Sequence, residues 1–158
     1  MAESFRCVVA TPTRVLFEGD VYYADVPGYA GHYGVLKGHE SLVATNHQGG
    51  KLVLHLDPDG NEKREFLIHR GCTQMLHDHL AVLARFGRAI DDLDLESSKK
   101  RAEEVKAEIE ERKAQMEGET DEDRIAAAQA FITTEGIRQE WHEAKVYFLE
   151  TGQESPKQ

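Results

Sequence analysis

Residues 51–69 read KLVLHLDPDGNEKREFLIH, and this stretch decides the fold class. Its two ends, residues 51–56 and 64–69, are rich in apolar residues, as β-strands are. The middle, Asp57-Pro58-Asp59-Gly60-Asn61, has the Asp, Pro and Gly residues that supply the backbone angles of tight turns. The stretch therefore predicts an antiparallel β-hairpin.

Similar short segments lie on both sides of this hairpin, up to about residue 90. The additional predicted strands cover residues 6–10, 15–17, 21–26, 41–44 and 80–84. Turn residues separate them, as at Pro27-Gly28 and Gly49-Gly50. Because no helical pattern interrupts this series, we expect residues 1–90 to form an antiparallel β-sandwich or barrel.

After Asp91 the apolar period changes from two to about 3.6, which is typical of helices. The first predicted helix has a narrow apolar stripe and ends at Gly118, and Thr120 is the expected N-cap of the second. The stripes consist of Ala102, Val105, Ile109 and Met116 in the first helix, and Ala127, Ala130 or Phe131, Thr134, Ile137, Trp141 and Ala144 in the second. The short link predicts an antiparallel helical hairpin over residues 91–149, followed by a disordered tail over residues 150–158.

The net charge also differs between the predicted sandwich and the predicted helical hairpin. The net charge of −10 consists of −1 in residues 1–90 and −9 in residues 91–158, which argues against a nucleic-acid partner. No apolar run reaches the roughly 20 residues that span a bilayer, and the first ten residues do not resemble a signal peptide. We therefore expect a cytosolic chain, in which Cys7 and Cys72 are free, buried thiols.

Motifs for catalysis are scarce. The sequence has no phosphate-binding loop, nucleophile elbow or zinc-protease motif. His77-Asp78-His79, together with His32 and His39, leaves open a cupin-like metal site, but the signal is weak and polar turn residues are the favoured explanation of these histidines.

The segment from Gly28 to Leu42 carries glycines at 28, 31, 34 and 38. It lacks the helix and the Lys-Ser or Lys-Thr pair of a phosphate cradle, so we interpret it as a compact loop at a sheet edge. Tyr29, His32 and Tyr33 would then be available as contact residues.

The order of these features resembles the epsilon subunit of the rotary proton-translocating ATP synthase. The matching segments are Val8-Val9-Ala10-Thr11-Pro12, Phe17-Glu18-Gly19, Gly28 to Leu42 with His39 in register, Arg70-Gly71-Cys72, Val82-Leu83-Ala84 and Asp92-Leu93-Asp94.

This resemblance implies a ten-stranded β-sandwich followed by a helical hairpin, in a noncatalytic subunit that couples proton flow to ATP synthesis. It further implies a peripheral protein at the cytoplasmic face of the cell membrane, whose partners are the gamma subunit and the c-ring. The expected partner contacts are Tyr29, His32, Tyr33 and His39.

In many members of the family the hairpin can also extend and inhibit ATP hydrolysis. The side chains that we expect to meet the catalytic alpha and beta subunits are Arg124, Arg138, Trp141 and Lys145. Some members bind ATP through an (Ile/Leu)-Asp-x-x-Arg-Ala motif, but here Ser97 replaces the arginine, so we expect no cofactor. A small cupin-like metalloenzyme and a free-standing helical adaptor remain the alternatives.

Overall fold

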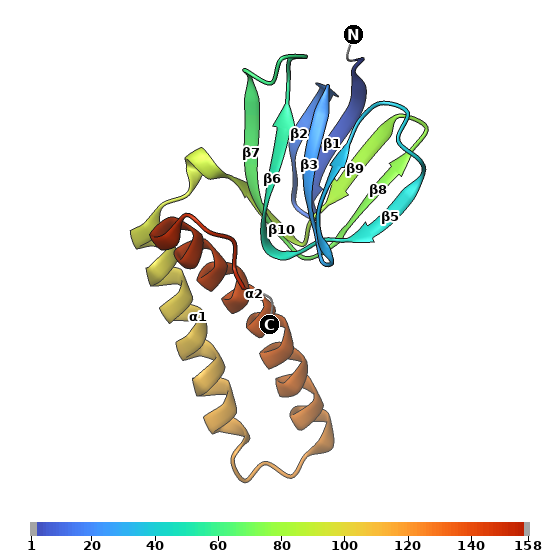
Figure 1. The fold of residues 1–158 in the computed structure, drawn as a ribbon. Coiled ribbons are helices and arrows are strands. Elements are labelled where there is room, and N and C mark those ends of the chain that lie inside the picture. The colour runs from blue at the N-terminus through green and yellow to red at the C-terminus, as the bar shows by residue number, and fades with distance from the viewer. Residues whose placement is uncertain (1–2, 157–158) are drawn as a thin grey trace. The chain divides into compact units, whose positions relative to one another are not determined.

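The computed structural model describes residues 3–156, which form ten strands, a short 3-10 helix and two long helices (Figure 1). The strands are β1 (Phe5–Thr11), β2 (Arg14–Val21), β3 (Tyr23–Gly28), β4 (Gly31–Val35), β5 (Leu42–Thr45), β6 (Gln48–His55), β7 (Lys63–His69), β8 (Cys72–Leu76), β9 (His79–Leu83) and β10 (Phe86–Ala89). They are followed by η1 (Ile90–Asp92), α1 (Leu95–Met116) and α2 (Glu122–Thr151). The predicted β-sandwich followed by a helical hairpin is confirmed.

The strands form two five-stranded sheets. One sheet has the order β2-β1-β9-β8-β5, and the other has the order β10-β7-β6-β3-β4. All pairings are antiparallel except that of β1 with β9. The predicted 51–69 hairpin corresponds to β6 and β7, in which His55 pairs with Lys63 across the turn.

The core of the sandwich follows from the alternation of side chains along each strand. In β9, Leu80 and Val82 are buried whereas His79 and Leu83 are exposed, and β6 and β3 alternate in the same way. The inward residues form one continuous apolar cluster between the sheets, which includes Val9, Val26, Leu52, Leu54 and Ile68.

Residues 94–153 form a second compact unit, whereas residues 3–93 and 154–156 group with the sandwich. Helix α1 begins at the N-cap Asp94, whose carboxylate accepts a hydrogen bond from the Ser97 N–H. It ends just before Gly118, which adopts a left-handed φ of 81°.

The start of α2 corrects the expected N-cap. Asp121, not Thr120, accepts hydrogen bonds from the N–H groups of Asp123 and Arg124. The Thr120 N–H itself donates to the carboxylate of Glu119, which also accepts from Asp121. The Asp121 carboxylate, at the N-terminus of α2, also interacts favourably with the helix dipole.

The buried face of α2 also differs from the expected stripe. Ala128 is buried, whereas Ala127, Ala130 and Thr134 are exposed. Near its start α2 offers mostly alanine and polar residues, so the apolar pattern there does not fix which face is buried.

The expected tail over residues 150–158 is corrected in part. Helix α2 continues to Thr151, whose hydroxyl donates to the Tyr147 carbonyl, and it ends where Gly152 takes a left-handed φ of 69°. Glu154 is hydrogen-bonded to the sandwich, and residues 157–158 lie outside the described part of the chain. Within residues 3–156 we find no helix long and apolar enough to cross a membrane.

Candidate partner-binding site

The glycine-rich segment begins with a tight hairpin rather than a loop. Gly28 at the end of β3 pairs with Gly31 at the start of β4, so Tyr29 and Ala30 form a two-residue turn. A Cβ on Gly28 would lie 2.7 Å from the Gly31 carbonyl oxygen, and Gly31 itself has a φ of 140°. These two positions therefore require glycine for the turn to close.

A second turn follows β4. Gly38 has a φ of 78°, and its N–H donates to the Asp78 carboxylate at 2.7 Å. The His39 N–H donates to the Leu36 carbonyl, and His39 Nδ1 lies 2.7 Å from the Glu40 carbonyl oxygen. This turn is therefore held against the β8–β9 connection.

The four predicted partner-contact residues do not form one patch. Tyr29 is 52% exposed at one end of β4, whereas His39 lies in the turn at the other end. Tyr33 packs against the sandwich core. His32 is exposed, but it is hydrogen-bonded to Asp25 and Glu154. Of the four, Tyr29 presents the large, exposed aromatic side chain.

A larger surface, which the sequence pattern did not predict, lies on the outer side of the β2-β1-β9-β8-β5 sheet. The pairing registers align Thr45, Cys72, Leu83, Ala10 and Val15 in one row across five strands. We define the outer apolar face as Val15, Val43, Cys72, Leu76 and Leu83.

The exposure of this face is high for aliphatic side chains. Val43 is 73% exposed, Val15 is 58% exposed and Leu83 is 46% exposed. The signal was present in the sequence, because residues 80–84 are apolar throughout instead of alternating with polar residues. Such a continuous run indicates a strand that is covered on both faces.

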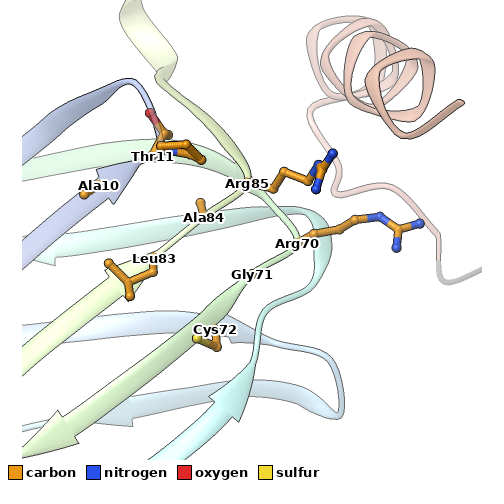
Figure 2. Close-up of a pocket in the computed structure, with 9 residues that line it drawn as sticks. Ala10, Thr11, Arg70, Gly71, Cys72, Leu83, Ala84 and Arg85 are labelled. Carbon is orange, nitrogen blue, oxygen red and sulfur yellow. The ribbon is translucent and has the colours of Figure 1, made fainter. Parts of the chain in front are cut away.

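A pocket of about 520 Å³ opens at one end of this face (Figure 2). Its lining residues are Ala10, Thr11, Pro12, Arg70, Gly71, Cys72, Leu83, Ala84 and Arg85. Gly71 has a φ of 89°, and a Cβ there would lie 2.0 Å from the Leu83 carbonyl oxygen, so only glycine fits. The side chains of Arg70 and Arg85 extend in the same direction (Figure 2). The lining is thus mainly apolar, and the two guanidinium groups point away from Ala10, Cys72 and Leu83, at the edge of the pocket (Figure 2).

The four residues expected to contact catalytic subunits are buried or make ion pairs within the hairpin. Trp141 and Lys145 are buried, with Lys145 Nζ 5.4 Å from the centroid of the Trp141 ring. Arg138 pairs with Glu135 at 3.2 Å, and Arg124 pairs with Glu119 at 3.5 Å. In this structure, Arg124 and Arg138 are the two that remain exposed.

The histidines near residue 78 serve a turn. His77 and Asp78 both have positive φ, and His79 Nδ1 lies 2.8 Å from the His77 carbonyl oxygen. Residues 3–156 contain no group of three or more His, Cys, Asp or Glu side chains that could hold a metal ion. The cysteines are both free, but Cys72 is exposed, contrary to the expectation, because it lies on the outer face of β8. Burial raises the pKa of the Cys7 thiol to about 12.

The helical hairpin also has a hollow, near the start of α1 and the end of α2. It is lined by Lys99, Ala102, Glu103, Glu143, Val146, Tyr147 and Glu150. Three of these residues are acidic, and the single cation, Lys99, pairs with Glu150 at 2.7 Å. The carboxylates would repel a phosphate group at this place.

Comparisons with known proteins agree with this architecture. Residues 4–88 match the family described as the ATP synthase delta/epsilon chain β-sandwich domain. The ATP synthase epsilon chain of Solibacter usitatus is 31% identical over 99 residues, which cover 63% of this chain and 71% of that one. The ATP synthase epsilon chain of Persephonella marina is 32% identical over 104 residues, which cover 66% and 74%.

A solved structure shares the fold. A chain in the mitochondrial ATP synthase of Euglena gracilis, determined as an OSCP/F1/c-ring assembly, superposes with a TM-score of 0.56 at 20% identity. The match covers 89% of this chain and 78% of that one. With the family match over more than half of its length, the chain belongs to the ATP synthase epsilon chain family, as a noncatalytic subunit.

Proposed function

We propose that this chain couples proton translocation to ATP synthesis by attaching its sandwich to the gamma subunit and the c-ring of an ATP synthase. It would act at the cytoplasmic face of the cell membrane as a peripheral subunit. The observation that carries the proposal is the outer apolar face. Soluble monomers rarely expose large contiguous apolar patches unless a partner covers them.

Two surfaces of the sandwich suit two partners. The outer apolar face and the adjoining pocket offer apolar area with Arg70 and Arg85 beside it, which fits a protein segment that carries both apolar and acidic side chains. We assign this surface to the gamma subunit. The β3–β4 turn offers the exposed Tyr29, and we assign it to the polar loops of the c-ring.

The test is association of the full chain with each partner. Leu83→Asp places a charge in the centre of the outer apolar face, and we expect gamma binding to weaken at least about tenfold, because an unpaired charge would be buried. Tyr29→Ala should weaken c-ring binding and leave gamma binding unchanged. Leu36→Asp is the matched control, since Leu36 is a similarly exposed leucine outside both surfaces. Equal gamma binding by Leu83→Asp and wild type would contradict the assignment.

We further propose that the hairpin inhibits ATP hydrolysis when it extends. Its net negative charge is unfavourable for docking on acidic surfaces, so Arg124 and Arg138 would make the contacts, and Trp141 and Lys145 would contribute only after the hairpin opens. Deleting residues 94–158 should raise hydrolysis by the assembled complex without a proton gradient. Unchanged hydrolysis would leave the hairpin without an inhibitory role.

The hairpin is not expected to bind ATP. The Asp of the family motif, Asp94, serves here as the N-cap of α1, and Ser97 supplies one neutral hydroxyl instead of a guanidinium. The acidic lining of the hollow supports the same proposal. Calorimetric titration of the full chain with ATP should give no binding heat, and micromolar affinity would contradict this expectation.

A further inference from the structure

After α2, the side chain of Glu154 makes hydrogen bonds with the sandwich. Gly152 ends the helix, and two residues later Glu154 Oε1 lies 2.7 Å from His32 Nε2 on β4. The same oxygen accepts a hydrogen bond of 2.6 Å from the Lys51 N–H on β6. Glu154 thereby joins two strands that are separated from it by more than 100 residues of sequence.

The Lys51 N–H lies just beyond the point where the pairing of β3 with β6 ends. Strands β3 and β6 pair only from Tyr23↔His55 to Asp25↔Val53, and the ladder ends there. Along β6 every second residue has the same backbone orientation, and Lys51 is the next such residue after His55 and Val53, which still pair with β3. A carboxylate at this place supplies an acceptor beyond the end of the ladder, and a charged acceptor makes a stronger hydrogen bond than a neutral one.

The other ring nitrogen of His32 completes the cluster. His32 Nδ1 lies 2.9 Å from Asp25 Oδ1 on β3, so the imidazole bridges two carboxylates. A neutral imidazole has one N–H, and it can donate to only one of them. Donation to both requires the doubly protonated, positively charged ring.

The surroundings of His32 favour that charged form. Burial by itself lowers the pKa of His32, but the hydrogen bonds and negative charges of Asp25 and Glu154 outweigh it, so the pKa lies above its usual value. The groups facing the ring are Asp25 from β3, Glu154 from the segment after α2, and the main chain of Lys51 from β6, whose ammonium pairs with Glu65.

We propose that residues 152–156 form a strap that Glu154 fastens to His32 and to the main chain of Lys51, with Asp25 holding the other side of the His32 ring, and that loss of the His32 proton releases it. The sign follows from the direction of the shift. A base whose pKa is raised on folding contributes stability that is complete below its usual pKa and is lost as the pH rises through the raised value. The strap is therefore fastened below the usual pKa of histidine and is freed as the pH rises above the raised pKa of His32.

The strap would also affect partner binding at His32, and only this consequence rests on the proposed function. His32 is one of the predicted partner contacts, and while the strap is fastened its imidazole is occupied by Glu154. Glu154 and a partner of β4 would then compete for the same side chain. The strap itself can be tested in the isolated chain, so its failure and that of the rotor assignment are distinguishable.

The experiment is NMR of the full chain across the pH range, following the His32 ring protons and the Lys51 amide proton. In the wild type both signals should titrate together, because release of Glu154 removes the acceptor of the Lys51 N–H. In Glu154→Gln the pKa of His32 should fall toward its usual value. Hydrogen exchange of the Lys51 amide should accelerate about tenfold, as expected for loss of a hydrogen bond to a charged group.

Glu150→Gln is the matched control, because it neutralises a carboxylate on the last turn of α2 that pairs with Lys99 and does not touch His32. It should leave the His32 titration and the Lys51 exchange rate at the wild-type values. Asp25→Asn is the second arm and should lower the pKa of His32 as well. If Asp25→Asn lowers it but Glu154→Gln changes neither signal, the strap is not fastened in solution and the proposal is overturned.

Discussion

The sandwich and the helical hairpin bury their apolar side chains to different depths. The sandwich encloses large residues such as Leu52, Leu54 and Ile68 between two sheets, so that they are fully shielded from water. The buried residues of the helices include Ser98, Lys145 and small alanines beside Val105, Ile109 and Trp141. The hairpin also carries almost all of the net charge. We infer that the sandwich provides the rigid part of the chain and that the hairpin is the part with a small free energy of opening.

The pKa values of two histidines are shifted in opposite directions in the sandwich and in the hairpin. His32 on the sandwich lies between two carboxylates, and its pKa is raised. His142 on α2 is half-buried, and burial lowers its pKa to about 4, together with the positive charges of Lys145, Arg138 and Arg101. Acidification therefore fastens the strap on the sandwich and weakens the hairpin.

The largest effect should come from a cavity in the sandwich. Leu52→Ala removes a fully buried side chain, and we expect the free energy of unfolding of the sandwich to fall by about 2–5 kcal/mol. Ile109→Ala in α1 should cost about 2 kcal/mol, the lower end of this range, because a pair of helices can collapse around the cavity more easily than two sheets. Denaturant titration measures both values.

The single tryptophan separates the two regions in this experiment. Trp141 lies in α2, so its fluorescence follows the hairpin, while the NMR amide signals of the sandwich strands follow the other unit. Leu52→Ala should move the second signal and leave the midpoint of the first in place. A common shift of both signals would show that the two units unfold together.

The sequence predicts most of the sandwich because period-two burial is a local property. The 51–69 hairpin, the change of pattern after Asp91 and the helix end at Gly118 follow from residue type alone. The strands β4, β8 and β10 were not predicted from the pattern, because β4 is rich in glycine and β8 and β10 are short and mix polar with apolar residues.

The candidate site was predicted less well. The sequence indicates the glycine-rich segment, but the outer apolar face exists only after five strands from distant parts of the chain align in register. The contacts of Glu154 with His32 and Lys51 span 122 and 103 residues, so no local pattern reveals them. Burial of Lys145 likewise depends on tertiary packing.

A second test uses the backbone of the sandwich. Gly71→Ala combines a left-handed φ with a Cβ that would lie 2.0 Å from the Leu83 carbonyl oxygen, and we expect a loss of about 3 kcal/mol. Gly38→Ala is the control, since Gly38 is also left-handed but a Cβ there meets nothing within 4 Å. It should cost about 1 kcal/mol. Equal losses in thermal unfolding would mean that the backbone at residue 71 relaxes easily.

The same substitution should have the opposite sign in the hairpin. Gly136 lies inside α2, and a Cβ there meets nothing within 4 Å. Gly136→Ala should therefore stabilise the hairpin by about 1 kcal/mol, the difference in helix propensity between the two residues. The midpoint of the Trp141 fluorescence transition checks this value. A destabilised variant would show that Gly136 permits a close approach that the isolated hairpin does not reveal.

The smallest expected effect is the pH dependence of the hairpin. Because the pKa of His142 falls from 6.5 to about 4 on folding, the unfolded chain binds a proton over this range that the folded hairpin does not. The stability of the hairpin is complete above pH 6.5 and decreases as the pH falls toward 4. Solvent screens a half-buried group, so the change should be modest. His142→Gln should flatten the dependence of the Trp141 transition between these pH values, whereas His79→Gln, at an exposed histidine of the sandwich, should leave it unchanged. If wild type and His142→Gln lose stability equally on acidification, the carboxylates of the charged helices, and not this histidine, set the acid sensitivity of the hairpin.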